Sequence, residues 1–303
     1  MTSSPSILCA VDLYSHSRIV LQHADAIAEH FGARLIAATV APSTGSQPLH
    51  DETALRSFVL DALPGAARWG RPHELRVRSG SAAPAIVAMA HEEAVDLVVV
   101  GTHGVGGFRK HVFGSTTEGV LRHAEFPVLV VPPRAADLHS LDDLRELRGI
   151  GTILAPVDFS PLSLRDAHIA AAIAGALSLP LQLVHIVAPP GVAGMLDRVR
   201  TSAMTRERAL EQLAALRHEL DANAAIDTVV LQGHPAEEIA ALAERAHAGL
   251  LVMGLRGTSG ALGPRPGSIA YRTLCLSPAM VLALPPVLRK AASDTLARER
   301  HGA

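Results

Sequence analysis

Residues 7–42 read ILCAVDLYSHSRIVLQHADAIAEHFGARLIAATVAP, and residues 153–189 read ILAPVDFSPLSLRDAHIAAAIAGALSLPLQLVHIVAP. Both stretches begin with Ile-Leu and reach a Val-Asp pair where the first apolar run ends. Each then places a serine five residues after the aspartate and closes on Val-Ala-Pro. A repeat of this length indicates a tandem duplication, in which each half of the chain is a separate folding unit.

Two further segments repeat later in each half. DLVVVGTHG at 96–104 matches GLLVMGLRG at 249–257, and FPVLVVP at 126–132 matches SPAMVLALP at 277–285. Equivalent residues are 146 positions apart at the two aspartates but 153 positions apart in these later segments. The difference predicts that about seven residues were gained or lost in the segment of the second helix.

Short apolar runs alternate with helical patterns along both halves. In the first half we predict strands near 6–11, 34–40, 73–78, 96–100 and 127–131, and helices near 15–31, 50–63, 83–94 and 115–124. In the second half we predict strands near 152–157, 181–187, 226–231, 249–253 and 279–284. The runs are continuously apolar, which is typical of parallel strands covered on both faces. The predicted fold class is α/β, with two tandem doubly wound domains that each contain a five-stranded parallel sheet.

The expected domain boundaries follow from the repeat. We predict a first domain at 1–133, a linker at 134–150, a second domain at 151–286 and a charged tail at 287–303. The spacing of four leucines predicts a short amphipathic helix inside the linker: Leu138, Leu141, Leu144 and Leu147.

The composition excludes several classes of function. Among 303 residues, 27 are Lys or Arg and 29 are Asp or Glu, so no global basic field attracts nucleic acid. No apolar run of about 18 residues exists to span a membrane, and the N-terminus lacks the basic start of a secretory signal. Two cysteines make neither a disulfide framework nor a zinc site, and we expect both thiols to be buried and inert. We therefore expect a cytoplasmic protein that binds neither nucleic acid nor membrane.

A glycine-serine pattern in the first half carries the clearest chemistry. Gly101 ends the fourth strand, Gly104 follows three residues later, and Gly114-Ser115 opens a helix after nine more residues. We expect Gly101 and Gly104 to allow close backbone approach and positive φ angles. The N–H groups at a helix start favour phosphate, and Arg109, Lys110 and His111 lie in the connecting loop.

The predicted topology places a second group opposite these glycines. If the winding direction reverses after the third strand, the fourth strand lies beside the first. Asp12, which ends the first strand, then faces Gly101 across the crevice beyond the strand ends, and Val40 at the end of the second strand offers backbone groups. These residues predict a nucleotide cleft, in which the carboxylate accepts from a base or ribose and the helix start holds phosphates.

The second half repeats the spacing G-x2-G-x9-G-S at Gly254, Gly257, Gly267 and Ser268. With this pattern in both halves, the chain resembles the ATP-binding branch of the universal stress protein family, in its tandem-domain form. The resemblance implies a Rossmann-like fold of the adenine nucleotide alpha hydrolase type and a non-enzymatic, ATP-binding regulator of stress survival, dormancy or low-oxygen adaptation. It implies ATP, with or without Mg²⁺, as the ligand.

The resemblance also assigns roles to individual residues. In the first half Asp12 and Val40 would hold adenosine, and the phosphates would lie against Gly101, Gly104, Gly114 and Ser115. Apart from the resemblance, we expect His103, inside the glycine pattern, and Thr116, next to Ser115, to lie near the nucleotide. In the second half the same roles would fall to Asp158, Val187, Gly254, Gly257, Gly267 and Ser268. Tyr14, in the first half, departs from the serine that the family often has. Pro264 and Pro266 stiffen the loop of the second half, so of the two predicted nucleotide clefts the first is the better supported.

Other interpretations of these residues stay open. The chain has no G-x4-G-K-[ST] motif, and no G-x-G-x-x-G follows the first strand of either half. An ATP-using transferase or pyrophosphatase of the same fold would need an S-G-G-x-D-S-like loop, where this chain has VDLYSHS and VDFSPLS. A weak ATP hydrolase and a nucleotide-independent interaction module remain alternatives. Asp12 and Asp158 could instead cap the helices that follow them.

Histidines and partners complete the expectations. His16, His23 and His30 recur every seven residues, too far apart along a helix to share a metal, and we expect them on a solvated face. The family resemblance implies that the last strands of the two halves pair within the chain as a pseudo-dimer, because both would otherwise be apolar edges. Association of two chains into a homodimer stays open.

Overall fold

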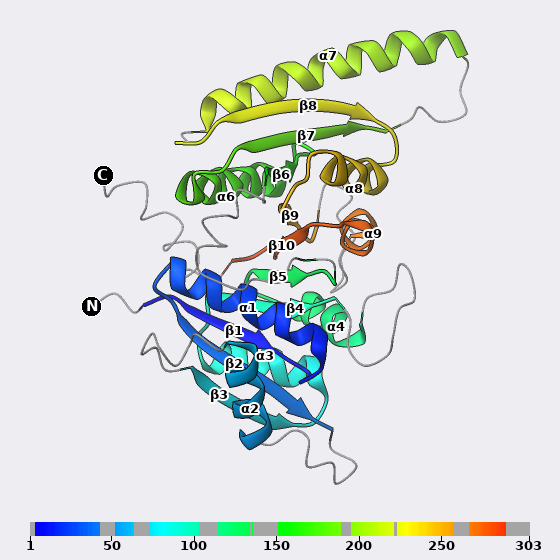
Figure 1. The fold of residues 1–303 in the computed structure, drawn as a ribbon. Helices are drawn as coiled ribbons and strands as arrows, with labels where there is room; N and C mark the ends of the chain where they lie inside the picture. Colours follow the sequence, from blue (N-terminus) through cyan, green and yellow to red (C-terminus); the bar gives the residue numbers. More distant parts are fainter. Residues whose placement is uncertain are drawn as a thin grey trace. The chain divides into compact units, whose positions relative to one another are not determined.

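The computed structural model describes residues 4–42, 52–63, 73–102, 114–133, 135, 151–188, 195–220, 223–256 and 267–288, with the backbone alone for 195–204. Nearly all of the predicted linker and tail, including the expected linker helix, lies outside these residues. The chain divides into two units, one with strands β1 to β5 and one with strands β6 to β10 (Figure 1).

The first unit is a parallel five-stranded sheet with the strand order β3-β2-β1-β4-β5. Its elements are β1 (Ser6–Ala10), α1 (Ser15–His30), β2 (Arg34–Ala41), α2 (Glu52–Ala62), β3 (Glu74–Ser79), α3 (Ala82–Glu92), β4 (Leu97–Gly101), α4 (Ser115–His123) and β5 (Val128–Val131). Strand β4 pairs with β1, which confirms the predicted reversal of winding direction.

The second unit repeats this topology with the strand order β8-β7-β6-β9-β10. Its elements are β6 (Ile153–Pro156), α6 (Pro161–Leu177), β7 (Leu181–Val187), α7 (Met195–Glu219), β8 (Ile226–Gln232), α8 (Pro235–Arg245), β9 (Leu250–Gly254), α9 (Ser268–Leu276) and β10 (Met280–Leu284). The strand registers place the predicted insertion between β7 and β8, the segment that contains the 25-residue helix α7.

The strands are apolar because helices cover both faces of each sheet. Helix α1 contacts α2, α3 contacts α4, and α8 contacts α9, so the helices flank the strands in pairs. Leu8 and Val98 in the first unit and Leu154 in the second are fully buried. Cys9 is buried in β1, and burial, followed by the charge of Asp25, raises the pKa of its thiol. Cys275, in α9, is half-buried, so only one of the two thiols is fully buried as expected.

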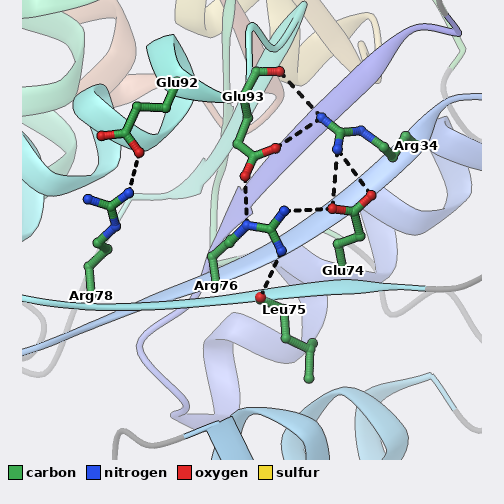
Figure 2. Close-up of polar contacts among 7 residues, drawn as sticks. All are labelled: Arg34, Glu74, Leu75, Arg76, Arg78, Glu92 and Glu93. Atoms are coloured by element: carbon green, nitrogen blue, oxygen red, sulfur yellow. Dashed lines mark hydrogen bonds and ion pairs between the residues drawn. The ribbon is translucent and has the colours of Figure 1, made fainter.

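Charged residues gather on β3, the outermost strand of the first sheet. Figure 2 shows Arg34, Glu74, Arg76 and Glu93, which we call the edge network, together with a separate pair, Arg78 and Glu92. Arg76 Nε donates to Glu93 Oε1 at 2.6 Å and Arg76 Nη2 donates to Glu74 Oε2 at 2.7 Å. Arg34 bonds the same two carboxylates at 3.0 and 3.2 Å. The hydrogen bond from Arg76 holds the pKa of Glu93 below its ordinary value.

The last helix pair of each unit packs differently. A methyl group on Gly119 of α4 would come within 2.5 Å of Ala83 Cβ on α3, so these helices approach closely only because residue 119 has no side chain. Four residues after the start of α9, at the position that matches Gly119, the second unit has Arg272, whose Nη2 lies 2.5 Å from Glu237 Oε1 of α8. The second unit therefore has an ion pair between these helices where the first unit has the Ala83 methyl group packed against Gly119.

Candidate functional site

The predicted site residues that the structure describes lie, in each half, at the carboxyl ends of neighbouring strands and at the start of the last helix. We call Asp12, Val40, Gly101, Gly114, Ser115 and Thr116 the first site, and Asp158, Val187, Gly254, Gly267 and Ser268 the second site. Strand β1 pairs with both β2 and β4, so the strand ends beside Asp12, Val40 and Gly101 are neighbours. His103, Gly104, Gly257, Pro264 and Pro266 lie outside the described residues, as do the loop cations at 109–111.

Asp12 is held in a tight turn between β1 and α1. Its Oδ1 accepts from the Ser17 hydroxyl at 2.5 Å and from the Tyr14 N–H at 3.1 Å, and its own N–H donates to Ser17 Oγ at 3.1 Å. Leu13 adopts a left-handed φ of 63°, a strained conformation for a branched side chain. The residue at the helix N-cap is Tyr14, so Asp12 positions the turn and is not itself the N-cap.

The start of α4 is fixed to the end of β4 by two hydrogen bonds. The Gly114 N–H donates to Thr102 O at 2.9 Å, and Thr117 Oγ1 donates to Gly101 O at 2.6 Å. The first bond within the helix joins the Glu118 N–H to Gly114 O. Gly114, the N-cap residue, has no side chain, so no side-chain cap accepts hydrogen bonds from the N–H groups of the first turn. The helix dipole is positive at this end. Ser115 at this start is exposed.

The expected positive φ at Gly101 is wrong, because the described glycines with positive φ are Gly32, Gly80 and Gly233. Glycine is needed here for space instead. A methyl group on Gly101 would lie 3.1 Å from Val20 Cγ2 and 3.3 Å from the His16 ring, tighter than ordinary contact.

The second site repeats the plan with different side chains. Asp158 Oδ1 accepts from the Ser160 N–H at 3.0 Å, and Phe159 has a φ of 60°. Here Ser160 is a true N-cap, whose Oγ accepts from the Ser163 N–H at 3.2 Å. The Gly267 N–H donates to Leu255 O at 2.8 Å, which fixes α9 to the end of β9.

Val187 and Ser268 occupy the expected places in the second site. Val187, at the end of β7, is buried, whereas Val40 at the end of β2 is half-buried, and Ser268 is as exposed as Ser115. Ile269 and Ala270 follow Ser268 where the first half has Thr116 and Thr117, so the hydroxyl that ties α4 to β4 has no equivalent.

Several residues that shape these sites were not predicted. Ser17 and Ser163 were visible as part of the repeat, but their role in closing the turn was not. Asp166 gave no sequence signal, although only 2% of its surface is exposed and it lies beside Gly254. Its Oδ1 accepts from Arg165 Nε and Nη2 at 2.9 and 2.6 Å. Burial raises the pKa of Asp166 to about 6 against the opposing charge of Arg165, with a smaller contribution from Asp158.

The histidines give no metal centre among the residues that the structure describes, since no three His, Cys, Asp or Glu side chains there are grouped to hold an ion. The expectation of a solvated histidine face is wrong for His23, which is buried with its Nδ1 2.8 Å from Ile19 O. Within the described ranges, no helix is both long and apolar enough to cross a membrane.

Sequence and structure comparisons agree with this architecture. A sequence model of the universal stress protein family matches residues 5–132 and again 149–285. Universal stress protein Rv2623 of Mycobacterium tuberculosis is 28% identical over 232 residues, which cover 68% of this chain and 74% of that protein. A functionally unknown protein from Pseudomonas aeruginosa, PA1789, superposes with a TM-score of 0.67 at 18% identity and covers 99% of both chains. A universal stress protein from Archaeoglobus fulgidus gives a TM-score of 0.61 at 19% identity over 93% of this chain and 99% of its own. The chain belongs to the universal stress protein family and carries two tandem domains of that family.

Proposed function

We propose that this protein binds ATP at the first site and acts as a non-enzymatic regulator of the stress response in the cytoplasm. The observation that carries the proposal is the anchoring of the α4 start on the end of β4, next to the Asp12 turn on the neighbouring strand. A helix start of the kind that binds phosphate and a carboxylate therefore lie at the same edge of one sheet.

The residues of the first site fit the chemistry of a nucleotide. The uncapped N–H groups and positive dipole of α4 suit a polyphosphate, and the exposed Ser115 hydroxyl adds a donor. Asp12 bonds its own turn through Oδ1, and within the described part of the chain no hydrogen bond engages its Oδ2. That oxygen can accept from a ribose hydroxyl or a base amine.

The hydrogen bonds of Asp12 favour a role in binding over a role in ATP hydrolysis. Asp12 is committed to the Ser17 hydroxyl and the Tyr14 N–H, which suits a fixed acceptor better than a general base that must gain and lose a proton. Mg²⁺ would enter with the phosphates of ATP, as in sites where substrate phosphates supply the ligands of the ion.

The test is the nucleotide content of freshly purified protein, followed by calorimetric titration with ATP. We expect bound adenine nucleotide, binding by the emptied protein and no release of inorganic phosphate over hours. Ser115→Glu should abolish binding at the first site by placing a negative charge at an exposed helix start, where glutamate does not weaken the helix. Ser115→Gln is the neutral control of the same size.

Absence of nucleotide together with no heat on titration would refute the proposal and favour a protein-interaction module. Steady phosphate release that Ser115→Glu removes would instead show an ATP hydrolase.

A further inference from the structure

The two sites differ in the residue at one equivalent position of the first helix of each half. Val20 follows Asp12 by eight residues, and Asp166 follows Asp158 by eight. Each side chain packs against the glycine that ends the neighbouring strand. A methyl group on Gly101 would touch Val20 Cγ2, and a methyl group on Gly254 would overlap Asp166 Oδ2. A carboxylate therefore occupies in the second half the place that an apolar side chain occupies in the first.

The charge of Asp166 is only partly compensated. Arg165 binds Oδ1, but the same guanidinium also donates to Pro285 O and Pro286 O at 2.9 and 2.8 Å. Asp166 Oδ2 is buried and has no hydrogen-bond partner among the described residues. Ion pairs and isolated charges act strongly through the low dielectric of a protein interior.

This oxygen lies at the strand end that connects to the start of α9. It lies against Gly254, and the next residue, Leu255, supplies the carbonyl that receives the Gly267 N–H at the start of α9. Asp158 adds a second carboxylate at the end of β6, which pairs with β9. The end of the second sheet therefore carries two carboxylates, Asp158 and Asp166, where the first has Asp12 and the uncharged Val20. Two negative charges in this region would repel a polyphosphate at the start of α9 more strongly than one charge would at α4.

We propose that Asp166 is a specificity-determining residue of the second site, where it disfavours the polyphosphate of ATP and leaves an uncharged nucleoside such as adenosine preferred. This inference rests on the proposed nucleotide-binding function, and it gives the two halves different ligands. The first site then prefers ATP and the second site prefers adenosine.

The experiment measures each site separately by calorimetry with ATP and with adenosine at pH 8. Ser115→Glu disables the first site and leaves the second to be measured, and Ser268→Glu does the reverse. In the Ser115→Glu protein, Asp166→Asn should strengthen ATP binding by at least about tenfold and change adenosine binding by less than about threefold. A purely structural role of Asp166 would move both ligands together.

The reciprocal change checks the result without disturbing α6. In the Ser268→Glu protein, Val20→Asp should weaken ATP binding by about tenfold and spare adenosine, and Val20→Asn is the uncharged control. Equal effects on the two ligands, or no recovery of ATP binding in Asp166→Asn, would overturn the inference. Failure of the first site to bind any nucleotide in the Ser268→Glu protein would instead count against the proposed function.

Discussion

The two halves share one topology but place their charges in opposite parts of it. The first half concentrates charge on its outer strand, in the edge network around Arg76 and Glu93 (Figure 2), and keeps Val20 beside its site. The second half has Val229 and Leu231 at the positions of Arg76 and Arg78, and buries Asp166 beside its site. The doubly wound sheet tolerates both arrangements because most of its stability comes from the buried apolar strands, and these polar groups change it by only a few kcal/mol.

The largest expected difference in stability between the two halves is at the contact between α3 and α4. Gly119→Leu should destabilise the first half by about 3 kcal/mol, because α3 and α4 must separate to admit the side chain. Hydrogen exchange of peptides from each half during urea unfolding locates the loss. Arg272→Leu, the matched change in the second half, should cost about 0.5 kcal/mol or less, since its ion pair with Glu237 is exposed. Equal losses in both halves would contradict the difference in packing.

The buried acid should give the second half its own pH dependence. The pKa of Asp166 is raised to about 6 in the folded protein, so folding favours its protonated form. Stability of the second half should therefore fall by about 2 kcal/mol as pH rises from about 4 to 6, and stay level above that.

Asp166→Asn should remove this slope while the first half keeps its own profile. The measurement is urea unfolding at a series of pH values with peptide-resolved exchange. A slope that survives in Asp166→Asn would show that another group causes it.

The edge network should stabilise the first half in the opposite pH direction. Glu93→Gln should cost about 1.5 kcal/mol at neutral pH, because Glu93 bonds both Arg34 and Arg76 and is largely buried. The pKa of Glu93 is lowered on folding, so this contribution is complete above about pH 4.5 and disappears as pH falls further through the folded value.

The neighbouring residue supplies the control for the network. Glu92→Gln removes a single exposed pair with Arg78 and should cost about 0.5 kcal/mol or less. Thermal unfolding of both variants at pH 7 and pH 3.5 separates them, and equal effects at pH 7 would mean that the network adds nothing beyond isolated pairs.

The smallest difference concerns the caps of the first helices. Ser160→Ala should destabilise the second half by about 1 kcal/mol through loss of the bond from the Ser163 N–H. Tyr14→Ser should stabilise the first half by a similar or smaller amount, since α1 has no side-chain cap. Chemical denaturation measures the free energy of unfolding of each variant. A loss of stability in Tyr14→Ser would show that the tyrosine makes packing contacts that a serine cap cannot replace.

The strands and helices of the described residues were predictable because each follows from an apolar run and its spacing. The pairing of β1 with β4, and hence the position of Asp12 near Gly101, followed from the rule for reversal in doubly wound sheets. The repeat itself located the inserted residues before β8. These features depend on local pattern and on topology, which the sequence carries directly.

The rest depends on packing that no single stretch encodes. Asp166 sits in LSLRDAHIAAA beside Arg165, which resembles an exposed charged pair, and only the approach of Gly254 from another strand shows that it is buried. At Gly101 the predicted positive φ is wrong, and the structure shows a different need for glycine, because a side chain there would crowd Val20 and the His16 ring. His23 was misassigned because its position relative to the sheet cannot be derived from heptad spacing.

Each half contains one cysteine, whose reactivity can report on the opening of that half. Cys9 lies in β1 with no exposed surface, and Cys275 lies half-buried in α9 of the other half. A thiol reagent can reach Cys9 only when β1 loses its cover, so its rate of modification under native conditions measures how often the first half opens. The energetics of one half can thus be followed in the intact chain without any engineered label.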